Sequence, residues 1–344
     1  MKFGWQQCLR WFAGNRAIPL LGIDLSPAGL CIVELSRLQE GWRVEHFSRR
    51  ALPQGAIREG SIVHAGQVAD ALLEALRECG SRTRNAALAL PPGLVIRKTL
   101  SFPNDLSDDE LAMQVETDAA QSLPFSLDEL SLDFSVIGPS TVMADSVEVM
   151  LVAARREKIA ERMTLAQSVG LEPVIIDVES QALIVAVTAQ ALDDEEQSSG
   201  YSALLQVGRD ASHFSVFSKD VVIFERELGV GLHKLEQASS RQPERVSAAL
   251  DAFHALICQE IRRAQQLYAT TAEQTEIARL FVAGPAEKIS RLPAAIHETL
   301  KIRALLANPF VHMDCSPAVD QPALHAAASD CLIACGLAMS RVTG

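Results

Sequence analysis

The sequence predicts an α/β protein of two domains, with a small α+β subdomain inserted in the first domain. Three observations predict this fold class. The chain has 344 residues, and a typical domain holds about 150. A pattern of three short strands, then helix and strand, occurs twice along the chain. A strongly acidic block with its own strands and helix interrupts the first copy.

The composition excludes several classes of protein. Hydrophobic residues make up 48% and charged residues 22%, as in ordinary globular chains. No apolar run approaches the roughly 20 residues of a membrane-spanning helix, and the N-terminus lacks the apolar core of a signal peptide. The net charge of −12 and the lack of a basic face argue against nucleic-acid binding. The seven cysteines form no CxxC pair, so we expect reduced thiols and a cytoplasmic protein.

The first domain is expected over residues 18–192. Val68, Leu72, Leu76 and Cys79 fall on one helical face, and Gly80 is a typical helix end. Its expected strands and helices are a three-strand meander (18–25, 30–36, 41–50), a helix (65–79), a strand (85–90), a helix (155–169), a strand (174–178) and a helix (179–192).

An acidic α+β subdomain is expected over residues 98–153. Between Thr99 and Ala154 there are eleven acids and no Lys or Arg, whereas the rest of the chain holds 32 acids and 31 bases. Ser107 and Glu110 have the spacing of a capping box. The helix that follows carries an apolar stripe of Leu111, Val115, Ala119 and Leu123. One strand is expected before this helix, at 94–102, and two after it, at 130–137 and 147–153.

The second domain is expected over residues 201–328, after a linker at 193–200 that holds no apolar residue. Its expected elements are strands at 203–207, 212–217, 221–228, 279–283 and 302–306, a long helix at 247–268 and a short helix before the last strand. A C-terminal helical segment, 329–344, is expected to return to the first domain.

Residues 1–17 form an expected amphipathic tail. Residues 1–16 contain three bases and no acid, and Trp5, Cys8, Leu9 and Phe12 lie on one helical face. Such a segment suits peripheral contact with an anionic membrane. A frayed tail and a helix packed on the body are the alternatives.

Two strand-to-strand turns occupy matching places in the two copies: Asp24-Leu25-Ser26 and Gly208-Arg209-Asp210. Facing turns of this kind can hold a polyphosphate between backbone amides and hydroxyls. The run Leu21–Ser26 resembles the first phosphate loop of the actin, Hsp70 and FtsA superfamily. The chain as a whole resembles the PilM family of type IV pilus assembly proteins, on the ordered stretches 52–63, 100–110, 121–125, 151–155, 176–179, 307–310 and 334–338.

The resemblance implies an actin-like (ribonuclease-H-like) two-domain fold with an insertion subdomain as in FtsA. It also implies a cytoplasmic scaffold at the inner-membrane face, whose partner is the N-terminal peptide of a PilN-like inner-membrane protein, linked in turn to PilO-like and PilP-like proteins. We expect the peptide at the acidic helix and the turn after it: Glu116, Asp118, Leu123, Pro124 and Phe125. The alternative is that the Leu-Pro-Phe turn only plugs the subdomain onto the first domain.

The resemblance further implies a site for ATP and Mg²⁺, with candidate residues Gly22, Asp24, Ser26, Asp177, Gly208, Arg209 and Gly284. The second turn departs from the family pattern, because Gln206 replaces an acid and Pro285 replaces a glycine and lacks an amide donor. We therefore expect a degraded nucleotide site and no enzymatic activity. An active or nucleotide-switched ATPase and an FtsA-like membrane filament former are the alternatives.

The residues allow a local reading of each candidate. Asp24 can cap its own turn, Asp177 can cap the following helix, and Arg209 can be a solvated turn residue. The sequence has no GxxxxGK[ST] loop, no HExxH and no nucleophile elbow. Cys331 and Cys335 lack two further zinc ligands. No catalytic or metal-binding residue is therefore predicted.

Overall fold

The computed structural model describes residues 18–27, 29–140, 143–190, 201–218, 221–241, 246–271 and 276–340. The expected tail (1–17) and linker (193–200) lie outside the described residues. The chain forms two compact units. Unit 1 comprises residues 1–40, 45–182 and 333–344, and unit 2 comprises residues 41–44 and 183–332. The division falls within a helix, between Ala182 and Leu183, ahead of the linker that the composition predicts.

The sheet of unit 1 has the strand order β10-β6-β1-β2-β3. β1 pairs antiparallel with β2 and parallel with β6, and β6 pairs parallel with β10. The carboxyl ends of β1, β6 and β10 therefore share one edge. The strands are β1 (Leu21–Ser26), β2 (Gly29–Arg37), β3 (Trp42–Ala51), β6 (Asn85–Leu90) and β10 (Glu172–Val178).

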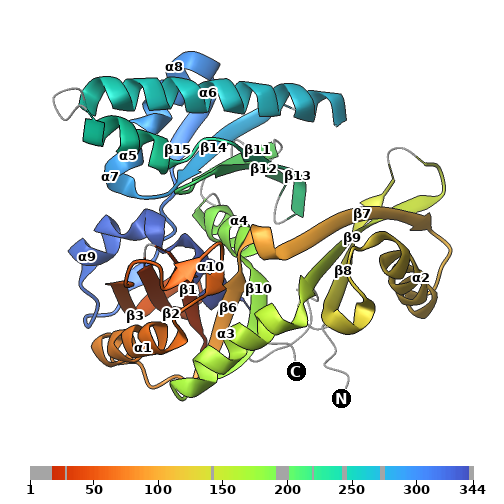
Figure 1. Ribbon diagram of the computed structural model, residues 1–344, viewed down its shortest axis with the longest axis horizontal. Helices are drawn as coiled ribbons and strands as arrows, with labels where there is room; N and C mark the ends of the chain where they lie inside the picture. Colours follow the sequence, from red (N-terminus) through yellow and green to blue (C-terminus); the bar gives the residue numbers. More distant parts are fainter. Residues whose placement is uncertain are drawn as a thin grey trace. The chain divides into compact units, whose positions relative to one another are not determined.

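Helices cover both faces of this sheet (Figure 1). Alternate residues Leu21, Ile23 and Leu25 of β1 pack in a core with α1 (Ala65–Cys79) and α3 (Arg156–Ser168). The opposite face of β1 meets α10 (Leu332–Met339), which also contacts α4 (Glu179–Gln190). α1 buries the predicted face and ends at Gly80, whose φ of 69° is left-handed.

The insertion subdomain, residues 95–155, follows the predicted order of strand, helix, strand, strand. β7 (Val95–Pro103), β9 (Ser146–Arg155) and β8 (Leu130–Pro139) form an antiparallel sheet in that spatial order. α2 (Asp108–Ser122) covers one face through the predicted stripe of Leu111, Val115 and Ala119. The predicted capping box begins α2: the Ser107 amide donates to Glu110 Oε2 (2.9 Å), and the Glu110 amide donates to Ser107 Oγ (3.4 Å).

The sheet of unit 2 repeats the topology of unit 1. Its order is β13-β12-β11-β14-β15, with antiparallel pairs from β11 to β13 and parallel pairs from β11 to β15. The predicted duplication is thus present in the structure. The strands are β11 (Tyr201–Val207), β12 (Ser212–Ser218), β13 (Val221–Leu228), β14 (Ile277–Ala283) and β15 (Arg303–Leu306).

One face of this sheet is covered by α6 (Val246–Thr271), whose buried stripe includes Phe253, Ile257 and Ile261 (Figure 1). α8 (Leu292–Leu300) packs in the same core through Leu292 and Ile296. The remaining helices of unit 2 are α5 (Leu232–Arg241), α7 (Ala286–Ile289) and α9 (Gln321–Ala326). A short strand, β16 (Asp314–Cys315), pairs with Arg43 and Val44.

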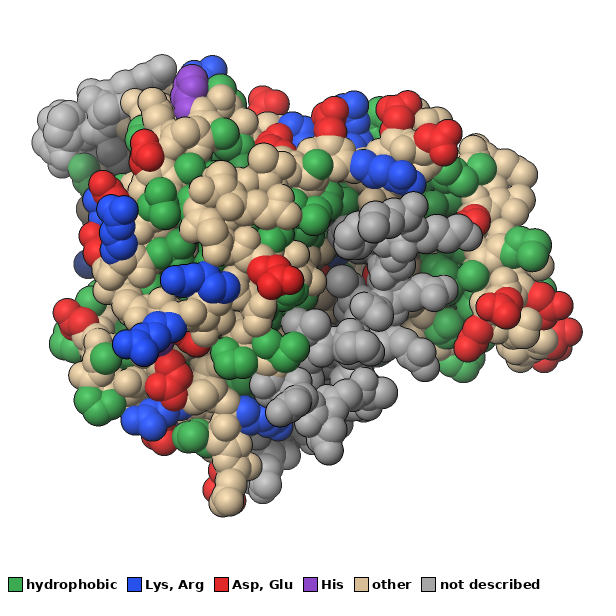
Figure 2. Space-filling view, turned by 90° about the horizontal axis from the view of Figure 1, so that it is seen from below, with side chains coloured by type: hydrophobic (Ala, Val, Ile, Leu, Met, Phe, Trp, Pro, Cys, Tyr) green, Lys and Arg blue, Asp and Glu red, His purple; other side chains and the backbone are tan. Residues whose placement is uncertain are grey.

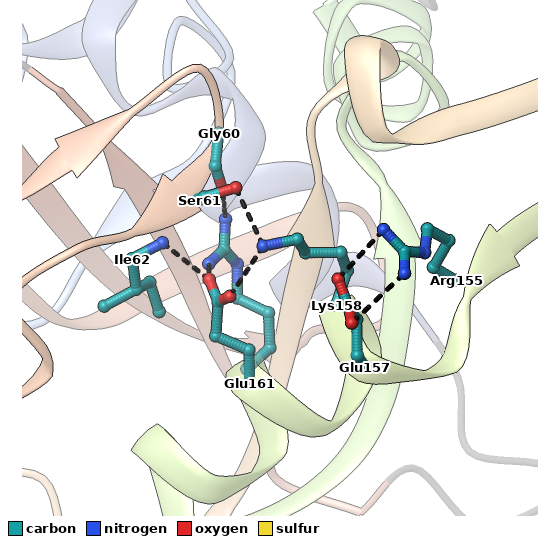
Figure 3. A network of polar contacts seen from close by, with 8 residues as sticks. Gly60, Ser61, Ile62, Arg155, Glu157, Lys158 and Glu161 are labelled. Atoms are coloured by element: carbon teal, nitrogen blue, oxygen red, sulfur yellow. Dashed lines mark hydrogen bonds and ion pairs between the residues drawn. The ribbon is translucent and has the colours of Figure 1, made fainter. Parts of the chain in front are cut away.

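The sequence pattern did not predict the hairpin of β4 (Ile57–Arg58) and β5 (Ser61–Ile62) in unit 1. A polar network from α3 holds it (Figure 3). The Ile62 amide donates to Glu161 Oε1 at 2.6 Å, and Lys158 Nζ donates to the Ser61 hydroxyl at 2.9 Å. Arg162 is 1% exposed and donates to the Gly60 carbonyl at 2.5 Å. These bonds fix the hairpin because a buried guanidinium must keep its acceptors.

Candidate functional site

The first predicted turn lies at the carboxyl end of β1. Asp24 is 7% exposed, and Ser26 Oγ donates to the Gly29 carbonyl at 3.1 Å across the turn. Gly22 faces α10, and a Cβ at this position would overlap the Ala334 carbonyl oxygen. In unit 1, therefore, Gly22 permits close helix packing. That it also lets a nucleotide approach the backbone stays a prediction.

Asp24, Asp177 and Glu179 gather at one edge of the sheet of unit 1. β10 ends just after Asp177, and α4 begins at Glu179. Burial, and then the Asp24 charge, raise the pKa of Glu179 to about 8, although Arg162 opposes the shift. A carboxylate surrounded in this way favours its neutral form unless a cation lies beside it.

Asp177 accepts a hydrogen bond from the amide of Val178 at 2.7 Å, directly before α4. Burial raises the pKa of Asp177 to about 6, while this hydrogen bond and the charge of Arg97 lower it. Among the residues that the structure describes, Asp177 accepts no amide from inside α4. Helix capping therefore does not account for its position.

The insertion subdomain contributes a further carboxylate to the same region. Asp133 of β8 is 8% exposed, and its Oδ1 accepts the amide of Phe134 at 2.8 Å. Burial, and then the charge of Asp177, raise the pKa of Asp133 to about 7, although the Phe134 hydrogen bond lowers it. Arg97 of β7 donates to the Ser180 hydroxyl, so the start of β7 lies beside the start of α4 (Figure 1).

Sequence reasoning missed Asp133 and Glu179 as members of this cluster. The sequence places Asp133 only in the acidic block, and Glu179 only in the stretch 176–179 that resembles the family. One signal for Asp133 was available: it lies between Leu132 and Phe134, which face the subdomain core, so alternation places it on the opposite face of the strand.

The second predicted turn, in unit 2, is closed by its own backbone. The amides of Leu232 and His233, at the start of α5, donate to the carbonyls of Gly208 and Arg209 at 3.0 and 2.7 Å. A Cβ at Gly231 would overlap the Arg209 carbonyl, so that carbonyl fills the space beside the turn. These amides at the helix N-terminus are therefore hydrogen-bonded within the protein and are not available to bind a phosphate.

Gly284 follows β14, the parallel neighbour of β11, so it lies at the same sheet edge as Gly208. Its φ of +139° excludes a side chain, and a Cβ there would lie 2.8 Å from the Val207 carbonyl oxygen.

An ion pair links the two helices next to this turn. Lys288 Nζ of α7 donates to Glu236 Oε1 of α5 at 2.5 Å. This hydrogen bond is the main cause of the lowered pKa of Glu236. Arg209 itself is exposed.

The residues of the second turn therefore do not fit ATP and Mg²⁺ well. The two amides at the start of α5 are engaged, Gln206 supplies no carboxylate, and Pro285 supplies no amide donor. No group of three or more His, Cys, Asp or Glu residues in the described part of the chain could hold a metal ion.

The five residues predicted for partner contact lie on α2 and the turn after it. Glu116 is exposed and Asp118 is half-buried. Leu123 packs against the subdomain core, whereas Pro124 is exposed. Phe125 is 37% exposed, and the Arg155 guanidinium lies 5.4 Å from its ring centroid. Leu123 therefore attaches the turn to the core of the subdomain, whereas Pro124 and Phe125 lie at the surface.

Acidic side chains gather on the surface of the subdomain, at the right of Figure 2. Exposed acids of this surface include Asp108, Asp109, Glu116, Asp128 and Glu129. Exposed apolar side chains accompany them, among them Met113 at 67% and Val136 at 52%. A surface of this kind suits a partner that is both apolar and basic.

Comparison with known proteins identifies the family. The family model described as "Type IV pilus assembly protein PilM" matches residues 22–244 and 241–342. The chain belongs to the PilM family. Because the match covers nearly the whole chain, it includes both units and the insertion subdomain.

Two solved structures share the fold of this PilM-family chain. A structure titled "PilM-PilN type IV pilus biogenesis complex" aligns with a TM-score of 0.81 and 22% identity, over 96% of this chain and all of that one. The ethanolamine utilization protein EutJ from Carboxydothermus hydrogenoformans aligns with a TM-score of 0.52 and 12% identity, over 94% and 90%. The predicted actin-like fold is confirmed.

The composition predicts that the chain has no membrane-spanning helix and that its cysteines are reduced. No helix within the described ranges is long and apolar enough to cross a membrane. The expectation of reduced thiols holds for Cys79, Cys258, Cys315 and Cys335. It is wrong for Cys31 and for Cys331, because each of them is a disulfide cysteine in this PilM-family structure.

Proposed function

We propose that this protein is a cytoplasmic, actin-like scaffold of type IV pilus assembly, which binds the N-terminal peptide of a PilN-like inner-membrane protein. The observation that carries the proposal is the PilM family match over almost the full length. The shared fold with a chain solved in a PilM–PilN complex supports it. Binding to such a partner would hold the protein at the inner-membrane face and link it indirectly to PilO-like and PilP-like proteins.

We place the peptide on the insertion subdomain, at Glu116, Asp118 and the turn 123–125. Phe125 supports this placement because an exposed aromatic ring is a frequent anchor in interfaces. The Arg155 guanidinium lies over its ring, 5.4 Å from the centroid. The exposed carboxylates of α2 would attract the basic end of the peptide and set its register.

The nucleotide site forms the second part of the proposal. The closed second turn, Gln206 and Pro285 favour a scaffold without ATP hydrolysis. The carboxylates of Asp24, Asp177 and Glu179 at the strand ends of unit 1 favour the alternative, a nucleotide-switched ATPase, because acids at that edge can orient a water beside a bound nucleotide, although among the described residues they form no metal-binding group of their own. The Mg-ATP titration described in the Discussion separates the two.

The test of partner binding uses the labelled N-terminal peptide of the PilN-like partner and fluorescence anisotropy. Phe125→Ala combined with Glu116→Lys is expected to weaken binding about tenfold or more, equivalent to about 1.4 kcal/mol. Asp70→Lys, at an exposed position of α1, is the matched charge control. Unchanged affinity in the folded double variant overturns this placement, and lack of binding by the unmodified protein overturns the proposed function.

A further inference from the structure

The described chain enters unit 1 at the amino ends of its parallel strands. β1 pairs parallel with β6, and β6 with β10, so their three amino ends share one edge, the lower edge of unit 1 in Figure 1. The Asn85 side-chain amide donates to the Pro19 carbonyl at 3.4 Å, and the Glu172 amide donates to the Arg84 carbonyl at 2.8 Å. We call this edge the entry edge; it comprises residues 18–20, 77–85 and 171–172.

Three arginines of the entry edge are exposed and form no ion pair among the described residues. Arg82 and Arg84 lie in the loop between α1 and β6, beside the place where the chain enters. Arg84 donates to the carbonyl of Thr83 at 3.2 Å. Arg77 lies in the last turn of α1, directly before this loop. The loop therefore presents cations that no neighbouring carboxylate neutralises.

Few acids offset these cations. Glu172 is exposed at the entry edge, whereas Glu78 is already paired with Arg50 at 2.5 Å. Arg37 and Glu40, at the end of β2 and just after it, are both exposed and opposite in charge. The acids of the strand ends lie at the other edge of the same sheet, where they are Asp24, Asp177 and Glu179. Unpaired cations therefore outnumber unpaired acids at the entry edge.

The sequence before the entry edge has the same charge. Residues 1–16 contain the bases Lys2, Arg10 and Arg16 and no acid, and their aromatic side chains include Trp5, Trp11 and Phe12. Together with the three exposed arginines of the entry edge, this makes six bases. Clusters of about four to eight bases beside an amphipathic segment are typical of sites that bind anionic lipids.

We propose that the entry edge of unit 1 and residues 1–16 together bind the surface of an anionic membrane. A short amphipathic segment alone binds a bilayer weakly and reversibly, so stable attachment needs a second contact. Arg82 and Arg84 supply that contact. The acidic insertion subdomain does not prevent it, because charges separated by more than about 8 Å are largely screened at physiological salt.

The proposal orients unit 1 on the membrane. With the entry edge at the lipid surface, Asp24 and Asp177 at the opposite edge lie away from the lipid phosphates, which avoids repulsion between like charges. Attachment also confines the protein to the membrane that holds its proposed partner, and so raises its effective concentration there. The contact itself does not depend on that partner.

The test is sedimentation of the purified full chain with lipid vesicles, in the absence of any partner protein. Vesicles of phosphatidylglycerol mixed with phosphatidylcholine are compared with vesicles of phosphatidylcholine alone, at low and high salt. The edge variant combines Arg82→Gln with Arg84→Gln, and the tail variant combines Trp5→Ser with Phe12→Ser. Circular dichroism verifies that each variant is folded.

The matched control combines Arg58→Gln with Lys98→Gln, which removes the same charge from two exposed positions of unit 1. Arg58 belongs to the β4–β5 hairpin, whose Gly60 lies against Pro91, beyond the carboxyl end of β6. Lys98 belongs to β7 of the insertion subdomain. Both positions are therefore outside the entry edge.

We expect the unmodified protein to bind the anionic vesicles, to bind the neutral ones little, and to be released by salt. The edge variant should partition about tenfold less well, and the tail variant should lose binding by at least as much. The control should bind within about twofold of the unmodified protein, because its substituted residues do not face the lipid.

Four outcomes overturn the inference. Protein that stays in the supernatant with anionic vesicles has no lipid contact, as when the tail packs on the body. Equal binding to neutral vesicles excludes recognition of charge. Loss in the tail variant alone removes the entry edge from the contact, and equal loss in the control and the edge variant assigns the effect to net charge. Each of them leaves the proposed function standing, because the partner peptide is titrated separately.

Discussion

Asp133 and Asp177 lie on strands of two different sheets of unit 1, yet the charge of Asp177 raises the pKa of Asp133. Each carboxylate accepts the amide of the residue that follows it, Phe134 and Val178 respectively. The pair therefore couples the insertion subdomain to the edge of the main sheet through charge, and the charge of Arg97 offsets part of the effect on Asp177.

This relationship predicts how stability depends on pH. Because the pKa of Asp133 is raised in the folded state, the folded protein binds more protons than the unfolded chain, and its stability falls as pH rises towards about 7. Asp133→Asn cannot ionise. We expect the variant to match the unmodified protein near pH 4 and to be the more stable of the two near pH 8, in urea unfolding measured at each pH.

Asp128→Asn serves as the control for this measurement, since Asp128 is exposed. Its unfolding free energy should follow that of the unmodified protein across the range. Parallel curves for Asp133→Asn and the unmodified protein would show that Asp133 is not buried as described here.

The contact between Gly22 and α10 predicts a strong effect of a single methyl group. Gly22→Ala places its Cβ against the Ala334 carbonyl, which belongs to helix backbone and cannot move aside alone. We expect a loss of about 3 kcal/mol in unfolding free energy, from overpacking. Thermal unfolding followed by circular dichroism measures it.

Gly66→Ala is the matched control, because nothing lies within 4 Å of a Cβ at Gly66 in α1. That substitution should leave stability unchanged or raise it by up to about 1 kcal/mol, since alanine favours the helix. A Gly22→Ala protein as stable as Gly66→Ala would mean that α10 does not pack on β1 as described.

The second turn predicts the response to nucleotide. Calorimetric titration of Mg-ATP into the protein at about tens of micromolar is expected to give no binding heat, because Gln206 and Pro285 lack the acid and the amide donor that the site needs. Gln206→Asp with Pro285→Gly should restore measurable binding.

Gln206→Asn with Pro285→Gly is the control, because it restores the amide without the charge. Clear one-site binding by the unmodified protein would contradict the degraded site and favour the nucleotide-switched alternative. Restored binding in the control would assign the loss to Pro285 alone.

The sequence by itself determined the features that depend on residues close together along the chain. The α1 stripe ends at Gly80, and the Ser107–Glu110 capping box starts α2, because both result from spacing within one helix. The repeated order of strands predicted the two sheets and, with the ordered family motifs, the actin-like fold. The positions of the candidate residues on turns followed from the same local patterns.

Only the tertiary structure decided which of these residues meet. Gly22 packs against Ala334, and Asp133 is influenced by Asp177, although each pair is far apart in sequence. Arg162 lies on a helix whose pattern does not mark it as buried, yet it is 1% exposed under the β4–β5 hairpin. The burial of a group and the neutralisation of its charge depend on which residues lie near it in the folded chain. Many of those residues are distant in sequence, so local spacing does not indicate them.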